Sequence, residues 1–255
     1  MSGAPTERFS DRVADYARYR PGYPAESIET LRRQTGFNAA STVADIGSGT
    51  GIFADLLLPH AGTVYAVEPN APMRTHAEAT LGAQPNYRSV NAPAEATTLP
   101  EHSVDLITVA QAFHWFDPPA ARREFARILK PGGHVALIWN ERLTDTTPFL
   151  YAYENLLKSA ATDYTRVNHM NIDHAALASF FAPATFATFS FANAQHFDRA
   201  GLIGRALSSS YVPNAGQPGH DAFLTKLNAL FDEHAVDDRV SLAYTCKLHL
   251  GRLDQ

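Results

Sequence analysis

One stretch decides the fold: Val43-Ala44-Asp45-Ile46-Gly47-Ser48-Gly49-Thr50-Gly51-Ile52-Phe53. A short apolar run leads through closely spaced glycines into a second apolar segment, which predicts a strand, a tight turn and a helix. Glycine lets the chain turn sharply and lets a ligand approach the backbone where a side chain would clash. The spacing is Gly-x-Gly-x-Gly, and Ile52 stands where a dinucleotide-binding fingerprint has its third glycine.

An acidic residue ends the strand predicted after this turn. Glu68 ends the next predicted strand, 17 residues after Gly51. A carboxylate in that place can accept hydrogen bonds from both hydroxyls of an adenosine ribose. A surface glutamate would be an adequate explanation of Glu68 alone, but the glycine turn beside it favours a nucleoside-binding site.

Around this turn, short β-branched runs alternate with longer amphipathic segments. We predict strands at 42–47, 63–68, 86–90, 104–110 and 133–140. We predict helices at 25–36, 51–60, 71–82 and 118–129. This alternation predicts βαβ units, and therefore a parallel sheet with helices on both faces.

The remaining segments have other patterns. Residues 8–20 have helical spacing, and residues 141–182 and 192–239 are mostly helical in pattern around a predicted strand at 184–191. Residues 240–250 alternate strictly between apolar and polar, which predicts an antiparallel strand with one buried face.

Composition sets limits on partners and compartment. The 255 residues carry a net charge of −5 and show no basic run, so we expect no nucleic-acid or membrane partner. No apolar run is long enough to serve as a signal peptide or a membrane span, and Cys246 is the only cysteine. We therefore expect a cytoplasmic protein. The eleven histidines show no metal-ligand spacing, and we expect no metal site.

Five segments occur in one order over residues 40–140. They are Asp45 with its glycine turn, Glu68-Pro69, Ala94-Glu95 with Leu99-Pro100, the strand 103–112, and Leu129-Lys130-Pro131-Gly132-Gly133. In these segments the sequence resembles the class I S-adenosylmethionine-dependent methyltransferases. The resemblance implies an α/β fold with a Rossmann-like, seven-stranded, mostly parallel sheet and an antiparallel last strand.

A narrower resemblance lies in 110–117, in the opening Phe9 to Pro21, and in the tail around Ser210 to Pro213 and Tyr244. These segments are similar to the small-molecule branch that includes the trans-aconitate-type methyltransferases. We expect one domain over 1–255, with an N-terminal lid at 1–24, a cofactor-binding core at 40–140, and a helical cap over the substrate pocket at 141–182 and 192–239. The cap follows from two long connections at the cofactor side of the sheet.

The resemblance implies S-adenosylmethionine as the cofactor and assigns its contacts. The glycine turn would pass beneath its methionine and ribose, Glu68 would hold the ribose hydroxyls, and Pro69 and Met73 would flank the adenine. The full set is Asp45, Gly47, Ser48, Gly49, Glu68, Pro69, Met73, Ala94, Glu95 and Gln111. The chain departs from many relatives at Pro93, where they have an acidic or hydroxyl side chain. Recognition of the adenine amino group therefore depends on Glu95 or on water.

The substrate side is assigned to residues at the edge of this core. His114 follows the fourth predicted strand, and it is our candidate general base or substrate hydrogen-bonding group. The equally weighted alternative is that it packs between Phe113 and Trp115. We also assign Trp115 to the substrate, together with Tyr16, Tyr19 and Arg20, which either form a lid or pack an N-terminal helix on the sheet.

These residues predict in-line transfer of a methyl group from S-adenosylmethionine to an O, N or C nucleophile of a small molecule. One alternative is an NAD-dependent oxidoreductase. It would share the glycine turn, but it would not account for the Ala-Glu…Leu-Pro and Pro-Gly-Gly segments. A second alternative is a non-catalytic S-adenosylmethionine-binding module. The oligomeric state and the acceptor are not indicated by the sequence.

Overall fold

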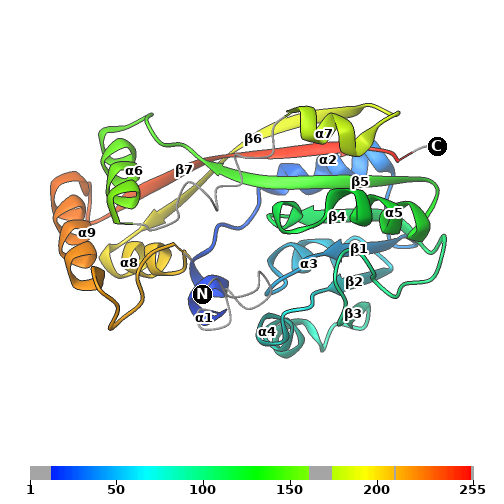
Figure 1. The fold of residues 1–255 in the computed structure, drawn as a ribbon, viewed down its shortest axis with the longest axis horizontal. Coiled ribbons are helices and arrows are strands. Elements are labelled where there is room, and N and C mark those ends of the chain that lie inside the picture. Colours follow the sequence, from blue (N-terminus) through cyan, green and yellow to red (C-terminus); the bar gives the residue numbers. More distant parts are fainter. Residues whose placement is uncertain (1–12, 161–173, 210, 254–255) are drawn as a thin grey trace.

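The computed structural model describes residues 13–160, 174–209 and 211–253. Within them a seven-stranded sheet has the strand order β3-β2-β1-β4-β5-β7-β6 (Figure 1). The strands are β1 (Thr42–Ile46), β2 (Thr63–Val67), β3 (Tyr87–Val90), β4 (Val104–Ala110), β5 (Leu129–Arg142), β6 (Phe186–Phe197) and β7 (Val240–Gly251). Strands β1 to β5 pair in parallel, whereas β7 pairs antiparallel with β5 and β6. The predicted mostly parallel sheet with an antiparallel last strand is confirmed.

Helices cover both faces of this sheet, as predicted. They are α1 (Val13–Tyr19), α2 (Ala25–Thr35), α3 (Ile52–Leu57), α4 (Ala71–Leu81), α5 (Pro118–Ile128), α6 (Pro148–Ala160), α7 (His174–Phe181), α8 (Arg199–Leu207) and α9 (His220–His234). One face packs against α2, α3 and α4, and the other packs against α5 and α7. None of the helices in the described ranges combines the length and apolarity needed to cross a membrane.

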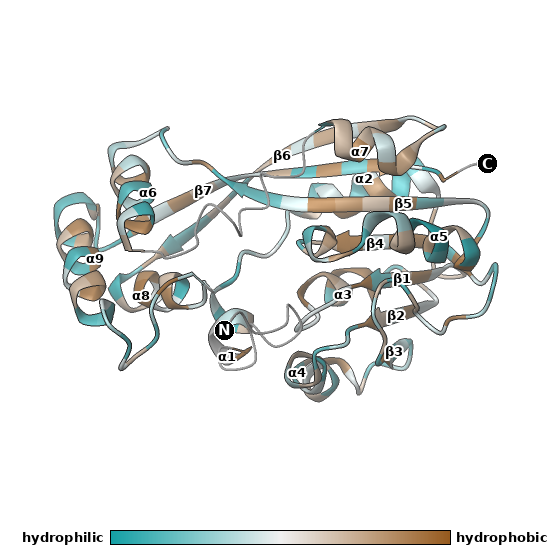
Figure 2. Cartoon of the chain, in the orientation of Figure 1, coloured by the Kyte–Doolittle hydropathy of each residue, from teal (hydrophilic) through white to brown (hydrophobic). Residues whose placement is uncertain are grey.

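The core follows from the two-residue period of the strands. Val43 and Leu106 are fully buried on the α2–α4 face, while their neighbours Ala44 and Ile107 are fully buried on the α5 face. Strands covered on both faces favour continuous apolar runs. The middle of β5 has one from Val135 to Trp139, and β4 is apolar apart from Asp105 and Thr108. Figure 2 shows the apolar stretch of β5 flanked by hydrophilic ends.

Three strands extend beyond the parallel core. The ends of β5, β6 and β7 reach past it, and α6, α8 and α9 gather there (Figure 1). These helices enclose a third apolar cluster, which includes Tyr153, Leu202, Phe223 and Leu242. The helices of the predicted cap thus have a core of their own. Residues 1–12 of the predicted lid and 161–173 of the predicted cap lie outside the described residues.

Some predicted boundaries are wrong. The strand predicted at 184–191 continues to Phe197, so residues 192–197, which we predicted as part of the helical cap, belong to the sheet. The reason is β7, whose 12 residues offer backbone partners as far as the pair Phe197 and Val240. Likewise, β5 begins at Leu129, directly after α5, instead of at residue 133.

Candidate functional site

A cavity opens at the carboxyl ends of the parallel strands. It is lined by residues that follow β1, β2, β3 and β4, and by a side chain from α1. Its empty volume is about 980 Å³, including the part open to solvent. The sheet order reverses between β1 and β4, and open α/β sheets bind ligands in the crevice at such a reversal. The topology therefore places this cavity where a ligand is expected.

The glycine turn forms the floor of the cavity. The backbone N–H groups of Gly47 and Ser48 both donate to the carbonyl oxygen of Val67, at 2.8 and 3.1 Å, which joins the turn to the end of β2. Gly47 has a φ of 69°, and a Cβ there would lie 2.5 Å from the Cβ of Ala112. Glycine is thus required both by the backbone conformation and by the close approach of the segment after β4.

Glu68 lies at the rim of the turn and is only 7% exposed. One carboxylate oxygen accepts the N–H of Gly49 at 2.9 Å, and the other accepts the N–H of Asn70 at 2.7 Å. Burial raises the pKa of Glu68, and these two backbone hydrogen bonds act in the opposite direction by favouring the charged form. Each oxygen retains further acceptor capacity, because an ionised carboxylate can accept about four hydrogen bonds.

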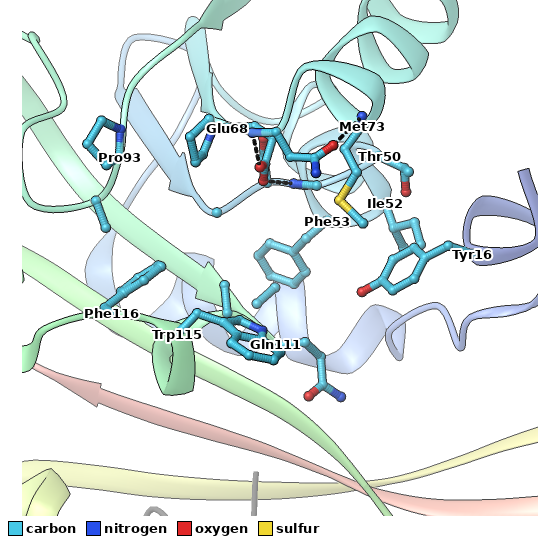
Figure 3. Close-up of a pocket in the computed structure, with 18 of the residues that line it drawn as sticks. Tyr16, Thr50, Ile52, Phe53, Glu68, Met73, Pro93, Gln111, Trp115 and Phe116 are labelled. Carbon is cyan, nitrogen blue, oxygen red and sulfur yellow. Dashed lines mark hydrogen bonds between the residues drawn. The ribbon is translucent and has the colours of Figure 1, made fainter. Parts of the chain in front are cut away.

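The start of α4 forms the wall of the cavity that faces Trp115 (Figure 3). The side chain of Asn70 accepts the N–H of Met73 at 3.0 Å and so caps the helix. Arg74 donates to the carbonyl oxygen of Glu68 at 2.9 Å from outside. Figure 3 shows Glu68 and Met73 on one side of the cavity and Trp115 across from them. The hydrogen bonds of Asn70 and Arg74 therefore fix the turn between β2 and α4.

Asp45 stands behind the turn and does not line the cavity. It is fully buried, and one carboxylate oxygen accepts the hydroxyl of Thr108 at 2.8 Å. The pKa of Asp45 is raised to about 7, mainly by burial and also by the charge of Glu68, while the Thr108 hydrogen bond opposes the rise. The structure therefore places Asp45 under the glycine turn, where it joins the ends of β1 and β4.

The segment after β3 supplies another wall. Pro93, Ala94 and Glu95 all line the cavity. A carboxylate oxygen of Glu95 accepts the N–H of Asp117 at 2.9 Å, just before α5. The second oxygen of Glu95 accepts no hydrogen bond within the residues that the structure describes, and it suits an exocyclic amino group. Pro93, the departure noted in the sequence, offers an apolar face.

Only some of the predicted site residues in the segment after β4 line the cavity. Gln111 and Trp115 line the cavity, but His114 does not. Gln111 has a positive φ of 56° and donates to the carbonyl oxygen of Asn140 at 3.1 Å. Strained backbone of this kind persists where surrounding contacts enforce it, often beside a binding site. His114 is half-buried on a short 3-10 helix, with its ring centroid 4.8 Å from that of Trp115.

Of the predicted substrate residues near the N-terminus, one lines the cavity and two do not. Tyr16 lines the cavity and reaches in from α1 (Figure 3), whereas Tyr19 and Arg20 do not line it. Just beyond them, the carbonyl oxygen of Gly22 accepts hydrogen bonds from Asn140 and Asn193 at 3.1 and 2.9 Å. The described end of the predicted lid, residues 13–24, is thus attached to the extended ends of β5 and β6.

Several lining residues were not predicted from the sequence. They include Tyr23, Thr50, Phe53, Asn70 and Phe116. A signal existed for Asn70, because an asparagine two residues before a proline and directly after the acidic strand end is a helix-capping pattern. The aromatic residues gave none, since side chains of this kind are found in any core.

Comparison with known proteins gives the site a context. Residues 44–137 match a family model described as a methyltransferase domain. An uncharacterised methyltransferase of Mycobacterium tuberculosis is 40% identical over 134 residues, which are 52% of this chain and 52% of that protein. An uncharacterised methyltransferase of Schizosaccharomyces pombe is 32% identical over 151 residues, which are 59% of each chain. The chain thus spans little more than half the length of these curated relatives.

Solved structures extend the likeness in fold. A candidate type II methyltransferase of Anaeromyxobacter dehalogenans matches with a TM-score of 0.67 and 21% identity, over 92% of this chain and 98% of that chain. Phosphoethanolamine N-methyltransferase 2 of Haemonchus contortus, solved with phosphomonomethylethanolamine and S-adenosylhomocysteine, matches with a TM-score of 0.57 and 14% identity, over 100% of this chain and 61% of that chain. The predicted Rossmann-like fold is confirmed.

Proposed function

We propose that this protein is an S-adenosylmethionine-dependent methyltransferase that acts on a small-molecule acceptor. The observation that carries the proposal is the buried carboxylate of Glu68, held by the N–H groups of Gly49 and Asn70 at the rim of the cavity. It lies within the 44–137 stretch that matches the methyltransferase domain. The narrower resemblance to trans-aconitate-type methyltransferases supports a small acceptor.

The cavity suits the cofactor that this function requires. Glu68 keeps acceptor capacity for two ribose hydroxyls, because each of its oxygens accepts one backbone N–H. A Cβ at Gly49 would lie 3.7 Å from the sulfur of Met73, and both residues line the cavity, so glycine keeps this space free. Met73 and Pro93 offer apolar walls to a flat ring. The remaining oxygen of Glu95 can accept from an adenine amino group.

For methyl transfer, the main role of this chain is to align the acceptor with the methyl group. The bound cofactor supplies a methyl group on a positively charged sulfur, which a nucleophile displaces in line. Holding nucleophile and methyl group in line accounts for much of such an acceleration. Tyr16 and Trp115 border the same cavity and would exclude water from the acceptor side. His114 remains our proposed general base for acceptors that must lose a proton, and an ionised carboxylate would need none.

Calorimetric titration tests the cofactor assignment. S-adenosylmethionine, S-adenosylhomocysteine and NAD are titrated into wild type, Glu68→Ala and Glu26→Ala, which removes an exposed glutamate at the start of α2. We expect both adenosyl ligands to bind wild type and Glu26→Ala, with affinity about 10- to 100-fold lower in Glu68→Ala, because two charge-assisted hydrogen bonds are lost. Binding of NAD alone would contradict the proposal.

Methyl transfer itself separates an enzyme from a non-catalytic module. S-adenosylhomocysteine release is followed over a panel of small carboxylic acids, phenols and amines. We propose that the cap selects among them, so replacing the cap residues 198–239 should change which acceptors react. Tight cofactor binding without turnover on any acceptor would favour the non-catalytic alternative.

A further inference from the structure

The segment that joins α1 to α2 is attached to the sheet by side-chain amides. It runs past the extended ends of β5 and β6 (Figure 1). The carbonyl oxygen of Gly22 accepts from Nδ2 of Asn140 at 3.1 Å and from Nδ2 of Asn193 at 2.9 Å. Three residues earlier, the carbonyl oxygen of Tyr19 accepts from Nε2 of Gln195 at 3.1 Å. Amide donors on two strands therefore determine the path of this segment.

Asn140 is the residue at which these contacts converge. It is only 3% exposed. Its side-chain oxygen accepts from Nδ2 of Asn193 at 2.9 Å, although β7 lies between their two strands. Its backbone carbonyl oxygen accepts from Nε2 of Gln111 at 3.1 Å. Burying an amide is costly unless its polar atoms are hydrogen-bonded, and this amide uses both its donor and its acceptor. Asn140 therefore connects the end of β4, strand β6 and the segment before α2.

The connected segments supply walls of the cavity, whereas Asn140 itself does not line it. Gln111 lines the cavity directly after β4. From the other segment, Tyr16 and Tyr23 line the cavity on either side of the attached carbonyl groups. The ring of Tyr23 meets that of Phe53 edge-on, with the centroids 4.9 Å apart. A single buried side chain outside the cavity thus supports lining residues from two distant parts of the chain.

We propose that Asn140 is a positioning residue for the ligand of this cavity. It holds Tyr16 and Gln111 in fixed places relative to one another and does not touch the ligand. The proposal rests on the proposed function above, which supplies S-adenosylmethionine as that ligand. Side chains that are ordered before binding do not have to lose their freedom when the ligand arrives, so their arrangement favours affinity. Asn140 was not singled out from the sequence.

A matched variant separates positioning from a general loss of stability. Asn86, just before β3, also donates from Nδ2 to two backbone carbonyl oxygens, those of Leu58 and Ala61, each at 2.8 Å. It does not line the cavity. Asn140→Ala and Asn86→Ala each remove an amide with two such contacts, so both should lower the urea midpoint of unfolding. Only Asn140→Ala should change ligand binding.

Calorimetric titration of S-adenosylhomocysteine measures that difference. We expect affinity about 10-fold lower in Asn140→Ala, because two side chains must then be ordered on binding. Affinity in Asn86→Ala should stay within about twofold of wild type. Asn193→Ala removes one of the two donors to Gly22 at a half-buried position, and it should weaken binding about threefold. That variant carries the test if Asn140→Ala does not fold, and Ser190→Ala, an exposed position on the same strand, is its control.

Hydrogen exchange tests the attachment without any ligand. The backbone amides of α1 should exchange about 10-fold faster in Asn140→Ala than in wild type, and at the wild-type rate in Asn86→Ala. Saturating S-adenosylhomocysteine should slow the exchange of α1 again in Asn140→Ala, because the bound ligand holds Tyr16 from the cavity side. A side chain that serves stability alone would not show this recovery.

Three results would overturn the proposal. The first is an equal loss of S-adenosylhomocysteine affinity in Asn86→Ala and Asn140→Ala, which would make the effect a consequence of lower stability. The second is wild-type affinity in both Asn140→Ala and Asn193→Ala, and the third is an unchanged exchange rate of α1 in Asn140→Ala. Failure of wild type to bind S-adenosylhomocysteine would count against the proposed function, while exchange in the free protein would still decide whether Asn140 holds α1.

Discussion

Asp45 should make the stability of the protein depend on pH. It is fully buried beneath the glycine turn, with one oxygen accepting from Thr108 and the other without a partner among the described residues. Burial raises its pKa from an ordinary value of 3.8 to about 7. The folded protein therefore holds this proton to a much higher pH than the unfolded chain does.

The sign of the effect follows from proton binding. Between the two pKa values the folded state binds more protons than the unfolded state, so the free energy of unfolding falls as the pH rises. The contribution of Asp45 is complete below about pH 4 and is lost once the pH passes about 7. At 1.36 kcal/mol per pH unit, the whole interval corresponds to about 4 kcal/mol, and the range from pH 5 to 8 to about 2–3 kcal/mol.

Urea unfolding at pH 5, 6, 7 and 8 measures this dependence in wild type and in Asp45→Asn. The amide of the variant can accept from Thr108 but does not ionise, so its stability relative to wild type should improve by about 2–3 kcal/mol between pH 5 and pH 8. Thr108→Val removes a hydrogen bond that favours the charged form, and it should move the transition to higher pH. Asp55→Asn, an exposed aspartate on α3, controls for loss of a surface carboxylate. Parallel curves for wild type and Asp45→Asn would refute the reasoning.

Three further perturbations have outcomes that the structure predicts. Gly47→Ala should lower the free energy of unfolding by about 1–3 kcal/mol in urea titrations, because its Cβ would overlap Ala112 at 2.5 Å and its φ is positive; an unchanged midpoint would contradict this. Glu154→Gln should cost about 3–5 kcal/mol in the same assay, since it leaves Arg142, whose side chain is only 10% exposed, without its carboxylate, and a loss below about 1 kcal/mol would be too small. Asn70→Ala should cost about 1 kcal/mol through loss of the α4 cap, and calorimetry should also show weaker S-adenosylhomocysteine binding, which a purely structural cap would leave unchanged.

The sequence by itself determined the elements whose causes are local. The glycine turn at 47–51, the strand end at Glu68 and the alternation over 240–250 each depend on residues close together in the chain. Steric freedom at glycine and the two-residue period of a strand act within a few residues, so a short stretch carries the whole signal. This is why the sheet, its antiparallel last strand and the wall of the cavity around Glu68 were predictable.

Some predicted residues depended on which way a side chain points. His114 and Trp115 are neighbours on a short 3-10 helix, yet Trp115 lines the cavity and His114 does not. A three-residue helix is too short to show a periodicity. Packing among several elements therefore determines which of the two side chains faces the cavity.

Only the tertiary structure decided how distant segments combine. The length of β6 is determined by the length of β7, and the chain between Tyr19 and Gly22 is held by Gln195, Asn140 and Asn193. Helix α1 packs on α8 because Gly204 lets the ring of Tyr19 approach. Each of these contacts joins residues far apart in the chain, whose approach depends on the burial and packing of whole elements, and no local pattern records it.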